Sequence, residues 1–228
     1  MASTELVPAG SLMARLVDAA AEDWRAYVEH EFVRQLGQGH LPEACFRHYL
    51  GQDYLFLIHF ARAYALAVFK SDSLAEMRQA AAIVTGLLDV EMRLHVEFCA
   101  GWGLTEAEME ALPEATATMA YTRYVLEKGL AGDILDLYAA LAPCVVGYGV
   151  IATGLAAAGV AADNPYRAWI GMYAGDEYRE LATAAVAQLD RLGEARLTEL
   201  RFPELARTFA QATRLEAAFW QMGLGLET

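Results

Sequence analysis

The sequence contains little cysteine and little positive charge. Its three cysteines, Cys45, Cys99 and Cys144, include no Cys-x-x-Cys pair, which argues against a disulfide framework and against a zinc knuckle. Thiols without a disulfide pattern are typical of the cytosol, so we expect a cytoplasmic protein. Lys and Arg number 17 against 30 Asp and Glu, and the resulting net charge of −13 disfavours nucleic acid and anionic membranes as partners.

The sequence also lacks the marks of secretion and of membrane anchoring. Its N-terminus has no basic stretch followed by a continuous apolar run, so we expect no signal peptide. Residues 137–162 carry no charge and are long enough to cross a membrane. They are flanked by Asp136 and Asp163 rather than by Lys or Arg, and they include Pro143. We therefore predict a buried core helix and no membrane partner.

Sustained alternation of Val, Ile and Thr is absent, and helical periodicity dominates. The pattern predicts helices over residues 11–35, 43–69, 74–100, 113–128, 166–191 and 203–223, a core helix that begins after Asp133, and a short helix after the capping box Thr105-x-x-Glu108. In the helix over residues 166–191 we expect a bend near Gly171 or Gly175. We therefore predict an all-α, single-domain bundle of about seven or eight helices over residues 1–228, with residues 1–10 as a loose segment.

Cys144 follows a proline inside the uncharged stretch. Because Pro143 has no amide hydrogen to donate, we expect the helix to kink there. Cys144 and Tyr148 are four residues apart and share a helix face, and Gly147 and Gly149 remove bulk beside it. A thiol, a phenol and missing side-chain volume favour the wall of a pocket. The alternative is a buried packing cysteine among small residues.

Asp53 falls on an otherwise apolar helix face that includes Phe56 and Phe60. An acid in this position must be paired or take part in chemistry. The alternative to a catalytic role is a structural ion pair with Arg62 or Arg47.

Glu216 lies one turn before Trp220 in the last predicted helix. A carboxyl group against aromatic rings has a raised pKa and can act as an acid or a base near neutral pH. The alternative is a solvated glutamate on an amphipathic helix.

Aromatic residues recur at helical spacing in two further places. Trp169, Tyr173 and Glu177 follow one line, and Tyr121 shares a face with Tyr124. Such lines are more often core than binding site, although a flat aromatic ligand would stack well among them.

The sequence offers little for a metal or a cofactor. Glu91-x-x-x-His95 is an i, i+4 pair that could reach one ion, but the paired Glu-x-x-His motifs of a di-iron bundle are missing. A glycine-rich phosphate loop is also missing. We therefore expect no metal and no cofactor.

Several separate segments resemble the TenA/thiaminase II family, and they occur in family order from about residue 20 to residue 222. The matching segments are Trp24-x-x-Tyr27-x-x-His30-x-Phe32-Val33, Tyr49-Leu-Gly-Gln-Asp53-Tyr54, Phe60-Ala-Arg62-Ala63, Glu91-x-x-x-His95, Tyr121-Thr122, Ala142-Pro-Cys144-Val-Val-Gly-Tyr148, Asn164-Pro-Tyr166-x-x-Trp169-Ile170 with Tyr173 and Glu177, and Glu216-x-x-Phe219-Trp220. The resemblance implies a heme-oxygenase-like helical fold and a homotetramer.

The resemblance further implies a hydrolase that acts on thiamine or on aminomethyl-substituted aminopyrimidines, in thiamine salvage or degradation. It assigns Cys144 as the nucleophile that adds to C6 of a 4-aminopyrimidine and Glu216 as the acid/base. It makes Asp53 the carboxylate that hydrogen-bonds the pyrimidine and steers the thiol. The implied pocket residues that position or stack the ring are Tyr121, Tyr148, Tyr173 and Phe219.

One position departs from the family pattern. The family has a second tyrosine three residues after the aspartate, where this chain has Phe56. Stacking survives there and one hydroxyl is lost, which affects the preferred substrate more than the reaction class.

Two other functions are compatible with the sequence. One is a non-catalytic, pyrimidine-binding regulatory protein, which would not bind DNA directly because no basic helix-turn-helix is visible. The other is an iron- or heme-dependent oxidase on the same fold.

Overall fold

The structure is a computed structural model, and it describes residues 6–228 apart from the side chains of Val90 and Leu94. Over these residues the ordered elements are helical, which confirms the all-α prediction. In chain order they are α1 (Leu12–Ala19), α2 (Ala21–Val28), α3 (Glu31–Gln38), α4 (Glu43–Lys70), α5 (Leu74–Gly86), a π-helical turn η2 (Leu87–Glu91), α6 (Met92–Ala100), α7 (Glu106–Glu110), α8 (Thr116–Ala131), α9 (Ile134–Ala158), α10 (Arg167–Ala174), α11 (Asp176–Arg196) and α12 (Phe202–Gly225).

The chain divides into two compact units. The first consists of the chain up to Leu41 together with Tyr138–Trp220, and the second consists of Pro42–Leu137 and Gln221–Thr228. The prediction of one domain over residues 1–228 therefore stays a prediction. Of the expected loose segment, residues 1–5 lie outside the described part of the chain, and Leu6 is buried against Gly149 of α9.

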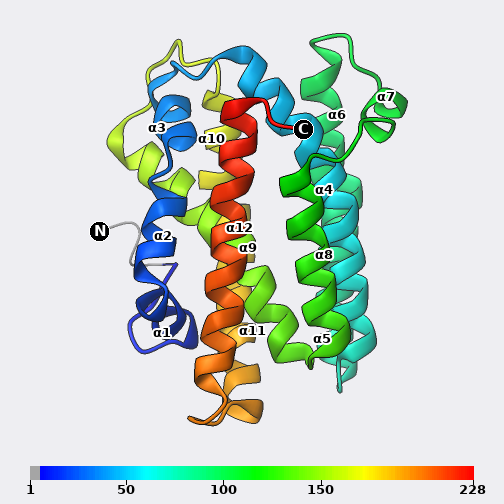
Figure 1. The fold of residues 1–228 in the computed structure, drawn as a ribbon, viewed down its shortest axis with the longest axis vertical. Helices are drawn as coiled ribbons and strands as arrows, with labels where there is room; N and C mark the ends of the chain where they lie inside the picture. The colour runs from blue at the N-terminus through cyan, green and yellow to red at the C-terminus, as the bar shows by residue number, and fades with distance from the viewer. Residues whose placement is uncertain (1–5) are drawn as a thin grey trace. The chain divides into compact units, whose positions relative to one another are not determined.

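The predicted helix over residues 11–35 is wrong in its length. Three short helices, α1 to α3, replace it and follow one another end to end (Figure 1). Ser11 caps α1 as expected, because its Oγ accepts from the amide of Ala14 at 3.0 Å. His30 caps the N-terminus of α3, because its Nδ1 accepts from the amide of Phe32 at 3.2 Å. Breaks of this kind raise the helix number above the predicted seven or eight.

Helix α9 contains the uncharged stretch, and 89% of its most apolar 18-residue segment is buried. It continues through Pro143 without interruption. It is long and apolar enough to cross a membrane, but its burial agrees with the predicted core helix. The kink expected at Pro143 stays a prediction.

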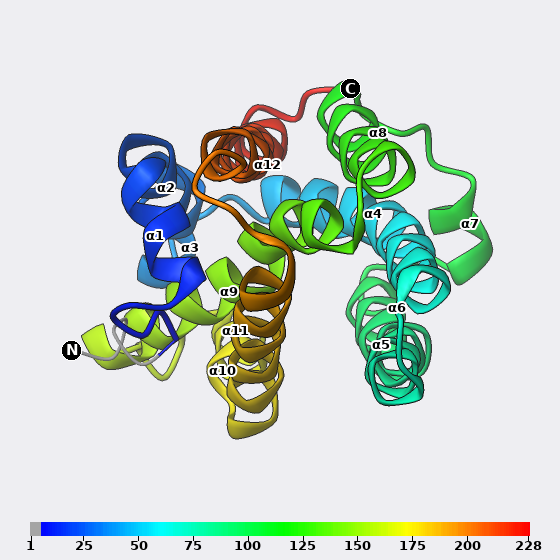
Figure 2. The same ribbon diagram turned by 90° about the horizontal axis from the view of Figure 1, so that it is seen from below.

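In the second unit α4 is the central helix. It lies between α8 on one side and the α5–α6 segment on the other, as Figure 2 shows from below. Gln52 of α4 binds the segment that precedes α8. Its Oε1 accepts from the amide of Ala115 at 2.8 Å, and its Nε2 donates to the carbonyl of Pro113 at 2.9 Å. Gln52 and its neighbour Asp53 are both buried, so this part of α4 is polar inside the core.

In the first unit α12 runs against several helices through aromatic contacts. Trp220 stacks on Phe32 of α3 with ring centroids 5.0 Å apart, and it lies 5.2 Å from the ring of Tyr148 on α9. Trp24 of α2 stacks on Phe209 of α12 at 5.8 Å. These large buried rings make the core of this unit, beside the turn of α9 that contains Cys144.

Candidate functional site

The residues singled out by the sequence occur in both units. The first unit contains Cys144, Tyr148, Tyr173, Glu216 and Phe219, and the second contains Asp53, Phe56 and Tyr121.

Cys144 differs from its helix neighbours in its exposure. Every other residue from 137 to 152 is buried, whereas Cys144 is partly exposed. A packing cysteine is normally among the most buried residues of a protein, so the partial exposure of Cys144 favours the pocket interpretation over the packing alternative. A partly exposed cysteine in an otherwise buried stretch of helix is suited to react with a small molecule.

Two tyrosines fix the backbone on either side of Cys144. The hydroxyl of Tyr27 donates to the carbonyl of Pro143 at 3.3 Å, and the hydroxyl of Tyr178 donates to the carbonyl of Val145 at 3.1 Å. Because these carbonyls belong to the residues that flank Cys144, the two bonds hold the turn that presents the thiol. No pattern in the sequence connects Tyr178 with this site.

Gly147 is required by the same arrangement. A Cβ at this position would lie 2.3 Å from Cε1 of Tyr27, a separation that real atoms do not adopt. The ring of Tyr27 is fully buried and has little room to move. Close packing of α9 on Tyr27 therefore depends on the missing side chain.

We expect Gly147→Ala to lower the free energy of unfolding by about 1–3 kcal/mol, because the overpacked ring must shift and its bond to Pro143 must lengthen. The matched control is Gly154→Ala on the same helix, where an added Cβ meets nothing within 4 Å. That control should gain up to about 1 kcal/mol from helix propensity. Urea unfolding of both variants measures the difference, and equal stabilities would contradict the assigned role of Gly147.

Tyr148 and Tyr173 lie together in an aromatic cluster. Their ring centroids are 5.0 Å apart, and Trp169 lies 4.8 Å from Tyr173 and 5.8 Å from Tyr148. The predicted line of Trp169, Tyr173 and Glu177 is wrong at its last member. A new helix begins after Gly175, whose backbone is extended, and Glu177 is exposed in the first turn of α11.

Glu216 is 2% exposed, so the alternative of a solvated glutamate is wrong. Phe219 and Trp220, which follow it on α12, are buried as well. A carboxyl group in such surroundings is costly to bury and is kept where it has a partner or takes part in chemistry.

Asp53 is also buried, and it has two donors within its own unit. Nε2 of His95 lies 2.7 Å from its Oδ2, and the hydroxyl of Tyr49, one turn earlier on α4, donates to the same oxygen at 3.1 Å. The predicted arginine partners are wrong: Arg62 bonds Nδ1 of His59, and Arg47 pairs with Glu43 and the carbonyl of Trp102. Asp53 is therefore paired, as a buried acid must be, and its partner in this unit is His95.

The charge state of His95 follows from its surroundings. Burial alone lowers the pKa of this imidazole, but the hydrogen bond and the charge of Asp53, together with Glu91, outweigh burial and raise it. Its Nδ1 lies 2.9 Å from the carbonyl of Glu91, which can only accept. Both ring nitrogens of His95 therefore face acceptors, the carbonyl of Glu91 and the carboxylate of Asp53, and the protonated ring can donate to both. From the sequence, His95 was half of a possible metal pair and part of a family-matching segment, and neither linked it to Asp53.

Phe56 and Tyr121 are brought together, with ring centroids 5.0 Å apart, and Phe60 stacks on Phe56 at 5.2 Å. Both Phe56 and Tyr121 are buried. Phe56, where the family pattern has a tyrosine, is therefore part of an aromatic cluster with Tyr121. Tyr121 is a residue that the resemblance predicts to bind the pyrimidine ring.

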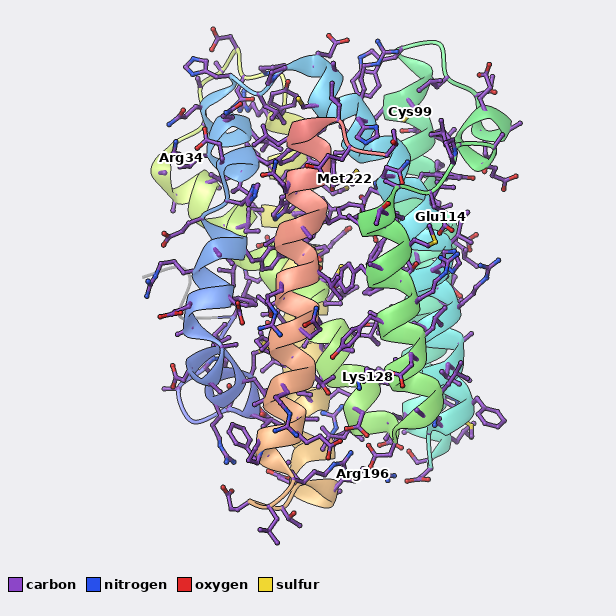
Figure 3. The ribbon with its side chains drawn as sticks, viewed as in Figure 1. Arg34, Cys99, Glu114, Lys128, Arg196 and Met222 are labelled. Carbon is purple, nitrogen blue, oxygen red and sulfur yellow. The ribbon has the colours of Figure 1, made fainter. Side chains whose placement is uncertain are left out.

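The other two cysteines are packing residues. Cys99 on α6 (Figure 3) is completely buried, and Cys45 is buried with its Sγ 3.3 Å from the carbonyl of Leu224. Burial raises the pKa of both thiols, which keeps them protonated and unreactive. Among the described residues, no group of three His, Cys, Asp or Glu side chains is placed to hold a metal ion.

Comparison with known proteins gives a consistent result. The model of the TENA/THI-4/PQQC family matches residues 17–226. The chain is 37% identical to an aminopyrimidine aminohydrolase of Halalkalibacterium halodurans over 93% of this chain and 95% of that protein. It is 30% identical to an aminopyrimidine aminohydrolase of Bacillus subtilis over 90% of this chain and 86% of that protein.

A solved structure agrees with these relatives. A protein of Silicibacter described as a TenA family transcription regulator matches with a TM-score of 0.91 and 45% sequence identity. The match covers 95% of this chain and 98% of that one. The similarity therefore extends over nearly the whole length of both proteins.

Proposed function

Because the chain belongs to the TENA/THI-4/PQQC family, we propose that it is an aminopyrimidine aminohydrolase of the thiaminase II type. Two relatives that match along almost their whole length have this activity in their names. The observation in this chain that carries the proposal is the partial exposure of Cys144 in a helix that is otherwise buried from residue 137 to residue 152. We further propose the cytoplasmic homotetramer that the cysteine content and the resemblance imply.

The chemistry begins with the Cys144 thiolate as a nucleophile. Its sulfur forms a bond to C6 of a 4-aminopyrimidine, and the ring nitrogen N1 takes up a proton. The 4-amino nitrogen then pushes its electron pair through C4 and C5 and expels the group on the C5 methylene, which is ammonia or a thiazole. Water adds to the exposed methylene. N1 loses its proton, the S–C6 bond breaks, and the aromatic ring and the thiolate are restored.

These steps need proton transfers, which we assign to Glu216. A buried carboxyl group on α12 can deliver a proton and take one back, as general acid–base catalysis requires. We assign to Asp53 the hydrogen bond to the pyrimidine. Tyr121, Tyr148, Tyr173, Phe219 and Phe56 are proposed to position or stack the ring.

Product analysis tests the reaction. Incubated with 4-amino-5-aminomethyl-2-methylpyrimidine, the protein should release ammonia and form the 5-hydroxymethyl product, with one oxygen from ¹⁸O-labelled water visible by mass spectrometry. Thiamine in a parallel reaction should give the same pyrimidine. Binding of either compound without any product would overturn the proposed activity and would favour a pyrimidine-binding regulator. The Silicibacter protein is described as a transcription regulator.

Phe56 makes the comparison of the two substrates informative. In Phe56→Tyr the added hydroxyl would enter the cluster of Tyr121 and Phe60, and it would restore the family's second tyrosine. A hydrogen bond of this kind is worth about 0.5–1.5 kcal/mol, so we expect the ratio of kcat/KM for the two substrates to shift by about three- to tenfold. An unchanged ratio would show that this position does not set substrate preference.

A further inference from the structure

The second unit contains a buried three-residue group that the proposed chemistry does not use in full. Asp53, His95 and Tyr49 are 3%, 2% and 0% exposed, and both donors bond the same carboxylate oxygen, Oδ2. The other oxygen, Oδ1, receives neither of these two bonds. A carboxylate fixed through one oxygen keeps the second oxygen in a defined direction for a further donor.

A local irregularity in the backbone accompanies the position of His95. The helix that runs from Leu74 to Ala100 contains the π-helical turn η2, which ends at Glu91. A π-turn contains an additional residue, so the side chains after it face another direction than an unbroken helix would give. His95 follows one turn later, and the carbonyl of Glu91 holds its Nδ1 at 2.9 Å. Both ring nitrogens are therefore fixed, one by the helix and one by Asp53.

We propose that His95 is a positioning residue that holds Asp53 as an oriented carboxylate, through which the protein binds the amino-substituted pyrimidine ring. The role rests on the proposed function, since Asp53 is the group that contacts the ligand. The three bonds act together, because Glu91 orients the imidazole, the imidazole supplies a charged donor to Oδ2, and Tyr49 fixes the same oxygen from within α4. A buried carboxylate without such donors would lose its hydration with nothing to offset the cost.

Ligand binding in a double-mutant cycle tests this role. His95→Gln keeps an amide donor but removes the charge, and we expect it to weaken binding of 4-amino-5-hydroxymethyl-2-methylpyrimidine by about ten- to a hundredfold. His95→Leu removes the donor as well and should weaken it further. In an Asp53→Asn background the His95→Gln change should have less than about a threefold effect, because its target is gone. The control His48→Gln alters a histidine that bonds the carbonyl of Glu227 and should bind as the wild type does.

These outcomes separate the two proposals. If the wild type binds the pyrimidine but His95→Gln weakens binding equally in both backgrounds, or not at all, the positioning role is wrong and the proposed function stands. If the wild type neither binds nor hydrolyses any aminopyrimidine, the proposed function fails and this role fails with it.

A spectroscopic measurement on the wild type requires no variant at this position to fold. In protein labelled with ¹⁵N-histidine, His95 should show two protonated ring nitrogens at pH 7, above the ordinary histidine pKa of about 6.5. Single substitutions of the other four histidines assign its signals. A neutral His95 with Nε2 unprotonated at that pH would overturn the proposal, whatever the activity.

Discussion

Cys144→Ser should lose more than about a thousandfold in kcat/KM, because a serine hydroxyl is a far poorer nucleophile than a thiolate at neutral pH. Binding of the pyrimidine product should change by no more than about threefold, since the exchange of sulfur for oxygen leaves the surrounding rings in place. Steady-state kinetics and calorimetric titration measure the two quantities. Hydrolysis at a wild-type rate would refute the role of Cys144 as nucleophile.

The other thiols provide matched controls. Cys45→Ser retains a donor that can reach the carbonyl of Leu224, so we expect normal turnover. An alkylating reagent should modify Cys144 first, because Cys45 and Cys99 are buried and burial raises their pKa. Inactivation should follow the modification of one thiol per chain. Loss of activity in Cys45→Ser with Cys144 intact would show that accessibility is a poor guide to the nucleophile here.

The sequence predicted the helical fold well because helical periodicity and capping are local. The capping box at Thr105 is present as expected, and the apolar stretch around Cys144 is a buried helix. The sequence-based prediction failed at the first helix, over residues 11–35. The cap of α3 is a histidine, which lies outside the usual set of capping residues. The prediction also failed at Glu177, because an extended backbone at Gly175 ends one helix and begins another within a single residue.

The partner of Asp53 could not be found from sequence for a related reason. Spacing along one helix can suggest only nearby residues as partners for Asp53, and it suggested Arg47 and Arg62. The actual partner, His95, is 42 residues further on and reaches Asp53 because α6 packs on α4. The π-helical turn before His95 leaves no signal in the sequence that periodicity could detect. Local rules thus identified the acid, and packing between helices determined what holds it.

Glu216→Gln should lower kcat by about a hundred- to ten-thousandfold, because the amide keeps the size and the burial of the side chain but cannot carry a proton between atoms. KM should change much less. The rate of the wild type should vary with pH through the ionisation of this group, and the variant should lose that limb of the profile. Glu204→Gln, an exposed change in the first turn of the same helix, should leave both kinetics and profile as they are.

The pH profile is the measurement that separates catalysis from folding. A buried carboxyl group can be essential simply because the core is built around it, and then Glu216→Gln would lower the melting temperature and the active fraction together. In that case the residual activity would keep the pH profile of the wild type, since the remaining folded molecules would use the same acid and base. A lowered kcat with an unchanged melting temperature and an altered profile is the result that the acid/base role requires, and an unaltered profile would assign Glu216 to the core instead.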